Sequence, residues 1–288
     1  MDELNIQWYP GHMTKTRRQM EQDLKLVDAV CEILDARIPI SSRNPDIASI
    51  CGNKPRMVIL NRMDMADPNA VKVWSEHFKK AGLAVVAMDC KSRKGINQFV
   101  PALRELLREK IERYAAKGQN RPLKIMVVGI PNVGKSTFIN QISGRKGAKA
   151  ENRPGVTRGK QWVTVNDSLL LLDTPGILWP KFEDKEVGMR LAYTGAVKDD
   201  ILDVETLAMH LMEMLWSRYP EAIQERYKIG DLPAETPGYE LLEAAGRKRG
   251  FLLSRGEIDT ERMARVLLEE YRNNKLGRFT LEMPEGEE

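Results

Sequence analysis

The stretch Gly129-Ile130-Pro131-Asn132-Val133-Gly134-Lys135-Ser136 decides the fold of this 288-residue chain. It follows the apolar run 124–128, which is typical of a buried strand, and it precedes a segment that is expected to be helical. The two glycines let the backbone curl so that successive N–H groups point inward at an anion. A glycine turn without a ligand is the simpler interpretation, but the order strand, loop and helix favours a phosphate-binding loop.

Each residue type in this loop has a chemical role. We expect Lys135 to place its charge on the β- and γ-phosphates and Ser136 to offer its hydroxyl to Mg²⁺. The positive end of the following helix dipole faces the same anion. The residues expected to contact the nucleotide here are Asn132, Val133, Gly134, Lys135, Ser136 and Thr137.

A second apolar run, 169–172, ends in Asp173-Thr174-Pro175-Gly176. Asp173 is expected to hold Mg²⁺ through water, and the Gly176 amide can turn toward a γ-phosphate. Alone this tetrapeptide is a common turn. Because it lies 44 residues after Gly129 and directly after an apolar strand, the metal-binding interpretation is favoured. Thr157 is expected to supply a second hydroxyl to Mg²⁺, and we count it with Lys135 among the catalytic residues.

The motif Asn61-Arg62-Met63-Asp64 follows a third predicted strand, 56–60. A carboxylate at Asp64 can accept from N1–H and the 2-amino group of guanine, and it would lose both partners with adenine. Asn61 would read the other edge of the base and tie this loop to the phosphate loop. Arg62 stands where Lys is usual; its stem can pack on the base, but its fork is bulkier.

A further loop, Asp89-Cys90-Lys91-Ser92, follows the predicted strand 83–87, and by position Cys90 and Lys91 are expected to contact the base. An ordinary GTPase has its phosphate loop first and its base-reading motif late. Here the base reader comes first, so the motifs are cyclically rotated.

With these motifs the chain resembles the circularly permuted ribosome-assembly GTPases, and within them the RbgA (YlqF) group. Three further segments resemble that group's signatures: Trp8-Tyr9-Pro10-Gly11-His12-Met13, Asp35-Ala36-Arg37-Ile38-Pro39 and Ser42-Arg43-Asn44-Pro45. The resemblance covers essentially the whole chain. Arg62 and the sequence 89–92 depart from the usual pattern.

The resemblance implies a GTPase that acts as a molecular switch in late assembly of the large (50S) ribosomal subunit. It implies that the protein binds precursor rRNA in its GTP state, with a tail domain on the RNA, and is released after hydrolysis. Mg²⁺ is the implied cofactor, and Asn132 resembles the asparagine that holds K⁺ in potassium-stimulated GTPases. A nucleotide-gated RNA-binding module with negligible turnover, or a GTPase acting on another ribonucleoprotein, remains an alternative.

The water-orienting group is open. Many GTPases have Gln directly after the metal-binding motif, whereas this chain has Ile177, whose apolar side chain cannot orient water. His12 is the internal candidate, because a neutral imidazole can accept a hydrogen bond from water, and the resembling family proposes this role for the same histidine. A structural or RNA-contacting His12 is the alternative.

The predicted fold class is α/β: a circularly permuted P-loop GTPase domain over 1–180, followed by a small α-helical domain over 181–288. The strands expected near 28–34, 56–60, 83–87, 123–128 and 169–172 alternate with helices, which predicts a doubly wound, mostly parallel sheet. Edge segments including 161–165 should complete it, and 117–122 should be the permutation joint. In the tail, helices are expected over 187–197, 204–218, 238–249 and 259–273.

Charge and composition are consistent with this interpretation. The net charge is only +4, but residues 145–160 hold six basic residues against one acidic, which suits phosphate-rich partners or a solvated loop equally well. Arg262, Arg265 and Arg272 are expected on the outer faces of the last helix. Three cysteines in no metal-binding or disulfide pattern predict a reduced, cytoplasmic protein. No run is long enough to span a membrane, and we expect a monomer with GTP or GDP and the 50S precursor as partners.

Overall fold

The computed structural model describes residues 13–144, 161–176, 184–197, 199, 203–230, 232–254 and 256–285, with side chains from residue 18 on. These residues form two compact units, which are described separately. The first holds the described residues up to 176 together with 282–285. The second holds those from 184 to 281.

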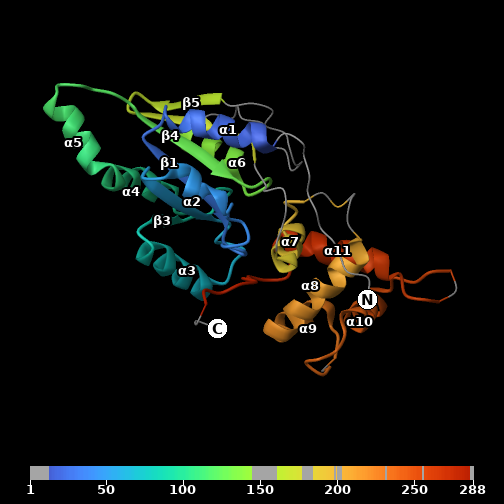
Figure 1. The fold of residues 1–288 in the computed structure, drawn as a ribbon. Coiled ribbons are helices and arrows are strands. Elements are labelled where there is room, and N and C mark those ends of the chain that lie inside the picture. The colour runs from blue at the N-terminus through green and yellow to red at the C-terminus, as the bar shows by residue number, and fades with distance from the viewer. Residues whose placement is uncertain are drawn as a thin grey trace. The chain divides into compact units, whose positions relative to one another are not determined.

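A six-stranded sheet organises the first unit (Figure 1). Its strands are β1 (Ala29–Asp35), β2 (Arg56–Asn61), β3 (Ala84–Ala87), β4 (Leu123–Gly129), β5 (Gln161–Asn166) and β6 (Leu169–Asp173). Their order across the sheet is β3-β2-β1-β4-β6-β5. All neighbours are parallel except β5 and β6, so the expected mostly parallel sheet is confirmed, with the expected edge strand at 161–166.

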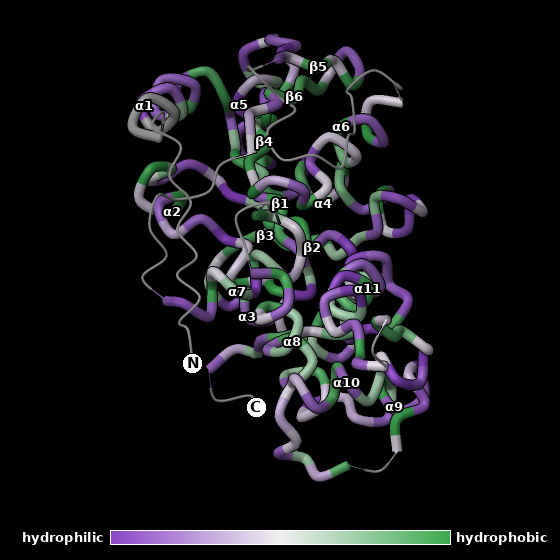
Figure 2. The backbone as a smooth tube through the Cα atoms, turned by 90° about the vertical axis from the view of Figure 1, so that its right-hand side faces the viewer, coloured by the Kyte–Doolittle hydropathy of each residue, from purple (hydrophilic) through white to green (hydrophobic). Residues whose placement is uncertain are grey.

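The central strands carry apolar residues on both faces, and helices therefore pack on both faces of the sheet. The helices of this unit are α1 (Met13–Leu24), α2 (Asp46–Cys51), α3 (Pro68–Lys80), α4 (Phe99–Leu106), α5 (Arg108–Ala116) and α6 (Lys135–Ser143), with a 3-10 turn at Ile96–Gln98. Helices α1 and α2 pack with Val30, Val128 and Leu172. Helix α3 packs farther along the same face. Hydrophobic residues are concentrated along the strands in Figure 2.

The opposite face is covered by α4 and α6, which meet through an edge-to-face contact of Phe99 and Phe138 with ring centroids 5.0 Å apart. Beyond α5, the chain turns at Gly118, whose φ of +63° favours glycine, and enters β4. The predicted joint at 117–122 therefore links a helix of one half of the domain to the strand that leads into the phosphate loop.

The last described residues complete the first unit, although the predicted helical domain extends to residue 288. The carboxylate of Glu282 accepts hydrogen bonds from the Ser41 amide at 2.8 Å and the Ser41 hydroxyl at 2.5 Å. The indole of Trp74 donates to the Glu282 carbonyl at 3.0 Å. The expected boundary near 180 falls among residues outside the described ranges and stays a prediction.

The second unit consists of helices around α8. Its members are α7 (Lys185–Tyr193), α8 (Val204–Arg218), α9 (Pro220–Tyr227), α10 (Gly238–Arg249) and α11 (Thr260–Arg272). Helix α7 ends before Gly195, whose φ is +77°, so the prediction that this helix continues to 197 was wrong. Helix α9 was missed, because Pro220 reads as a break although it is well tolerated in a first turn.

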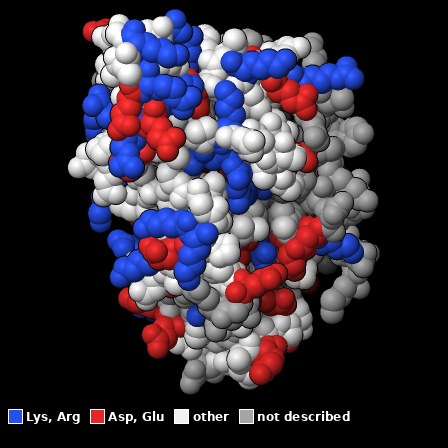
Figure 3. All heavy atoms as spheres, turned by 60° about the vertical axis from the view of Figure 1, so that its left-hand side comes forward, with Lys and Arg blue, Asp and Glu red and all other residues white. Residues whose placement is uncertain are grey.

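Basic and acidic side chains lie among one another on the face drawn in Figure 3. Lys and Arg side chains alternate there with Asp and Glu instead of gathering into one basic patch. Among the described residues, no helix combines the length and apolar character needed to cross a membrane.

Candidate nucleotide-binding site

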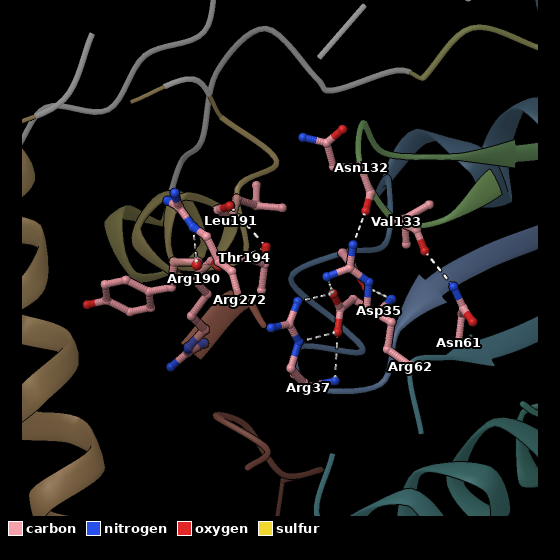
Figure 4. A network of polar contacts seen from close by, with 12 residues as sticks. Asp35, Arg37, Asn61, Arg62, Asn132, Val133, Arg190, Leu191, Thr194 and Arg272 are labelled. Atoms are coloured by element: carbon pink, nitrogen blue, oxygen red, sulfur yellow. Dashed lines mark hydrogen bonds and ion pairs between the residues drawn. The ribbon is translucent and has the colours of Figure 1, made fainter. Parts of the chain in front are cut away.

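Asn61 joins three loops at the carboxyl ends of the strands. Its side chain is buried, its Nδ2 donates to the Val133 carbonyl at 2.8 Å, and its Oδ1 accepts from the Cys90 amide at 3.1 Å. The Asn61 side chain therefore links the base-reading motif to both the phosphate loop and the 89–92 loop. The tie to the phosphate loop expected from the sequence is confirmed (Figure 4).

The phosphate loop has the curled backbone that an anion site needs. Asn132 has φ of +59° and Gly134 has φ of +98°, both in the left-handed region. A Cβ on Gly134 would lie 2.3 Å from Nδ2 of Asn61, so glycine is required by both conformation and space. Helix α6 begins at Lys135, and its dipole adds positive potential at the loop.

Lys135 and Asp173 are buried beside this loop, 7% and 4% exposed. Burial lowers the pKa of Lys135, and the nearby Asp173 carboxylate opposes that shift only in part. Burial likewise raises the pKa of Asp173, against the effect of Lys135. Within the described residues, the Oδ1 atom of Asp173 is buried without a hydrogen-bond partner. A buried carboxylate oxygen left in this way is suited to a metal-bound water.

These donors fit Mg²⁺ bound with a nucleotide. The half-buried Ser136 follows Lys135 in the first turn of α6. Its hydroxyl and the Asp173 carboxylate are oxygen donors of the kind that Mg²⁺ prefers. When bound, the ion would neutralise charge that develops on the phosphates. Lys135 would place its ammonium on the same oxygens.

Gly176 lies directly against the phosphate loop. A Cβ there would be 3.0 Å from both Cα and N of Pro131. The hydroxyl of Thr174 donates to the Val127 carbonyl at 2.8 Å, which fastens the turn after β6 to β4. The structure thus brings the Asp173 motif and the phosphate loop together, as the spacing predicts.

Asp64 follows Arg62 in the loop after β2 and is half-buried. Burial, reinforced by the nearby Asp89 carboxylate, raises its pKa. Donors from a ligand would relieve this electrostatic cost, and guanine offers two, N1–H and the 2-amino group. The position and chemistry of Asp64 suit the guanine-reading role.

In the loop 89–92, the Cys90 side chain is buried and the Lys91 side chain is exposed. The Cys90 thiol is 1% exposed, and burial raises its pKa to about 12, so a side-chain contact with the base does not fit its position. The Lys91 and Ser92 amides donate to the Asp89 carboxylate at 2.8 and 3.1 Å. This loop is a compact turn held by Asp89, with the exposed Lys91 at its surface.

Two predicted catalytic residues, His12 and Thr157, lie outside the described residues, as do Ile177 and the basic stretch 145–160. Sequence reasoning missed one participant, Asp35. Its carboxylate lies beside Arg62, and the signal available was a charged residue at the carboxyl end of β1, within the segment Asp35-Ala36-Arg37-Ile38-Pro39.

The phosphate loop, a magnesium-type carboxylate and a guanine-reading loop meet at the carboxyl ends of β4, β6 and β2. The base-reading strand precedes the phosphate-loop strand in the chain, yet the strands form one sheet in an order that suits a nucleotide. The fold and the site define a circularly permuted P-loop GTPase.

Ribosome biogenesis GTPase A of Priestia megaterium is 48% identical over 283 residues, which cover 98% of this chain and 98% of that protein. The chain belongs to the ribosome biogenesis GTPase A family and hydrolyses GTP to GDP and phosphate. A family model described as "50S ribosome-binding GTPase" matches residues 124–222. Mitochondrial ribosome-associated GTPase 1 of Mus musculus is 39% identical over 217 residues, or 72% of this chain and 66% of that protein.

Solved structures agree with the fold. The GNP-bound YlqF from T. maritima matches with a TM-score of 0.64 at 27% identity, covering 94% of this chain and 99% of that one. A GDP-bound YlqF structure matches with a TM-score of 0.66 at 26% identity, covering 93% and 100%.

Proposed function

We propose that this GTPase is a molecular switch in late assembly of the large (50S) ribosomal subunit. In its GTP form it binds precursor particles, and hydrolysis releases it. The observation that carries the proposal is the single side chain of Asn61, which joins the base-reading loop to the phosphate loop in a chain that matches a ribosome biogenesis GTPase over 98% of its length. A site of this kind distinguishes GTP from GDP through the γ-phosphate, which is what a switch requires.

The helical unit is the proposed RNA-binding part. Residues 241–278 carry nine Lys or Arg against six Asp or Glu. Arg262 is exposed and lies 4.2 Å from the ring centroid of Phe251, so its guanidinium is held at the surface. The side chain of Arg265 is 62% exposed and pairs with the equally exposed Glu261. Because both guanidinium groups are already exposed, they can contact phosphate without any rearrangement of the helix.

Arg272 does not belong to that surface, so its predicted outward position was wrong. Its guanidinium pairs with Asp199 at 2.7 Å and donates to the carbonyls of Tyr193 at 3.0 Å and Ala192 at 2.7 Å. Arg272 therefore satisfies carbonyls at the end of α7. Its replacement tests stability and not RNA binding.

Cosedimentation with 50S precursor particles tests the proposal. With a non-hydrolysable GTP analogue the protein should sediment with the particles far more than with GDP, and binding should weaken with salt because phosphate contacts release counterions. Arg262→Glu combined with Arg265→Glu should reduce binding in the analogue state. The matched control is Arg108→Glu, a 65% exposed arginine of the first unit in a similar helical ion pair. Equal sedimentation with GDP and the analogue would rule out the switch.

For the hydrolysis step, we propose Lys135 and Thr157 as groups that stabilise phosphate charge and His12 as the residue that orients water. His12→Ala should lower turnover and leave nucleotide affinity nearly unchanged, because a water-orienting group acts mainly in the transition state. A parallel loss of GTP binding would instead assign His12 a docking role.

Asn132 is the proposed K⁺ ligand. Its half-buried side chain stands at the positive-φ corner of the phosphate loop, where an amide oxygen can face a cation between phosphates. Hydrolysis should be faster in K⁺ than in Na⁺, and Asn132→Ala should reduce the difference. Equal rates of the unmodified protein in the two salts would remove K⁺ from the mechanism.

A further inference from the structure

Asp35 is a buried carboxylate at the carboxyl end of β1, 2% exposed. Arg37 donates to it from its backbone amide at 3.0 Å, from Nε at 2.9 Å and from an Nη atom at 2.7 Å. The Asp35 amide in turn donates to the Ser42 hydroxyl at 3.0 Å. Both the side chain and the backbone amide of Asp35 are therefore engaged, and Figure 4 shows its carboxylate between Arg37 and Arg62. Burial acts to raise the pKa of Asp35, but Arg37 and Arg62 outweigh it and hold the pKa below its usual range.

Arg62 spans the space between this carboxylate and the phosphate loop. One Nη atom lies 3.7 Å from Oδ2 of Asp35, and the other donates to the Asn132 carbonyl. Arg62 itself has φ of +61°, which turns its backbone out of the strand direction directly after Asn61. Its side chain is 23% exposed. A guanidinium can make both contacts because its donors form a rigid planar fork, whereas a lysine ammonium is a single point.

The orientation of two peptide groups follows from these contacts. In a trans peptide the C=O and N–H groups point in opposite directions, and the described backbone has no cis bond. Arg62 holds the Asn132 carbonyl, so the Val133 N–H points away from Arg62. Asn61 holds the Val133 carbonyl at 2.8 Å, so the Gly134 N–H points away from Asn61. Both amides are thereby turned away from the base-reading loop, toward the side on which we place the phosphates.

We propose that Asp35 is a positioning residue for the phosphate loop, acting through Arg62. Asp35 holds one end of the guanidinium, so that the other end stays on the Asn132 carbonyl and the Val133 amide is aimed before nucleotide arrives. Preorganised donors bind an anion more tightly because no ordering cost remains at binding. This inference rests on the nucleotide site proposed above and assigns it a residue outside the phosphate- and base-reading motifs.

A double-mutant cycle on the full-length protein tests the link, with the dissociation constant of GDP as the readout. Asp35→Asn should weaken GDP binding about tenfold when residue 62 is arginine, the cost of one charge-assisted contact. In the Arg62→Met background, Asp35→Asn should change the constant by less than about twofold, since the side chain that it acts through is absent. Urea unfolding without nucleotide measures the stability of every variant.

Arg43→Met is the matched control background. Arg43 is equally half-buried, at 22% exposed, and pairs at 3.2 Å with another β1 carboxylate, Glu32. In this background Asp35→Asn should keep its full effect on GDP affinity. If Asp35→Asn does not fold, Asp35→Glu takes its place in the cycle, because it keeps a charge for Arg37 and displaces it by one methylene group.

The positioning role would be overturned if Asp35→Asn weakened GDP binding by the same factor with and without the Arg62→Met substitution. It would also be overturned if Asp35→Asn left the GDP affinity unchanged when Arg62 is present. A purely structural Asp35 would lower the stability in both backgrounds without this coupling in affinity. A wrong assignment of the nucleotide site would give a different result from a wrong role for Asp35. In that case the unmodified protein would bind no GDP, or Asp64→Asn would leave GDP binding unchanged.

Discussion

At the scale of single residues, Gly134 determines how closely the base-reading loop approaches the phosphate loop. Its φ of +98° lies beyond the usual left-handed range of other residues, and Nδ2 of Asn61 occupies the place where a Cβ would be. The sequence predicts this glycine from its motif. The structure adds the reason, which is a side chain that arrives from 73 positions earlier in the chain.

Gly134→Ala should weaken GDP binding by at least about tenfold, because backbone strain and the clash with Asn61 move the loop amides. Gly118→Ala is the control, because Gly118 also has a positive φ of +63° but no described atom within 4 Å of an added Cβ. It should cost about 1 kcal/mol of stability and leave GDP affinity unchanged. Titration calorimetry with GDP measures the affinities. Equal losses of affinity in the two variants would contradict the role of the Asn61 contact.

Arg62 shows what the sequence can and cannot reveal about a site residue. The motif predicts its place next to the base, and its departure from lysine is visible. Its partner Asp35 is not predictable, because the pair depends on β1 and β2 being neighbours in register, with Asp35 opposite Asn61. Cys90 shows a second limit, since a motif position does not tell whether the side chain or only the backbone of a residue is presented to a ligand.

At the scale of elements, hydrophobic pattern and motif order predict most of the first unit. The strand runs and the edge strand 161–166 follow from apolar periodicity and turn residues. The ends of helices are less predictable, because α7 stops at a glycine with positive φ and α9 starts at a proline that looks like a break. Glycine and proline each have more than one local meaning, so either residue can mark a helix end or a loop.

Gly238 sets the distance between α8 and α10. It begins α10, and a Cβ there would lie 2.2 Å from the Met209 carbonyl oxygen. Gly238→Ala should therefore lower the free energy of unfolding by about 1–3 kcal/mol through overpacking. Gly230→Ala, with no atom of the described residues within 4 Å of the added Cβ, should stay within about 0.5 kcal/mol. Urea unfolding followed by circular dichroism compares them, and similar losses would show that the helices can move apart.

Glu270 of α11 links three helices. Its buried carboxylate accepts from Arg226 and from the Tyr227 hydroxyl of α9 and pairs with Arg249 of α10 at 3.2 Å. Burial acts to raise the pKa of Glu270, but the hydrogen bonds from Arg226 and Tyr227 and the charge of Arg249 outweigh it. The net pKa lies below the ordinary value.

Because the folded pKa is lowered, Glu270 stabilises the protein above the unfolded pKa of about 4.3, and this contribution is lost as the pH falls through the folded pKa. Glu270→Gln should cost about 2–3 kcal/mol at neutral pH, since it leaves arginines without their charge partner. The difference between the two proteins should shrink below about pH 4. Urea unfolding across this range checks it. A difference that does not vary with pH would show that the charge of Glu270 is not what stabilises the helices.

At the scale of the whole molecule, the permutation separates motifs in the chain that share one site in space. The first unit takes its strands from residues 29–173 and closes with Glu282 near the end of the chain. The order of a sheet followed by helices was predictable from the order of the motifs and from the change to helical patterns. The packing of the C-terminal residues against the first unit was not predictable, because it depends on one carboxylate, Glu282, that binds Ser41, and no sequence pattern marks such a contact.

Multiple-turnover hydrolysis by Asp64→Asn shows whether one guanine site drives a switch on large-subunit particles. Asparagine cannot accept from both guanine donors but can donate to the 2-carbonyl of xanthine. We expect 50S particles, and not 30S particles, to stimulate GTP hydrolysis by the unmodified protein and xanthosine triphosphate hydrolysis by Asp64→Asn. Continued use of GTP by Asp64→Asn, or the same rates with 50S particles, 30S particles and none, would contradict it.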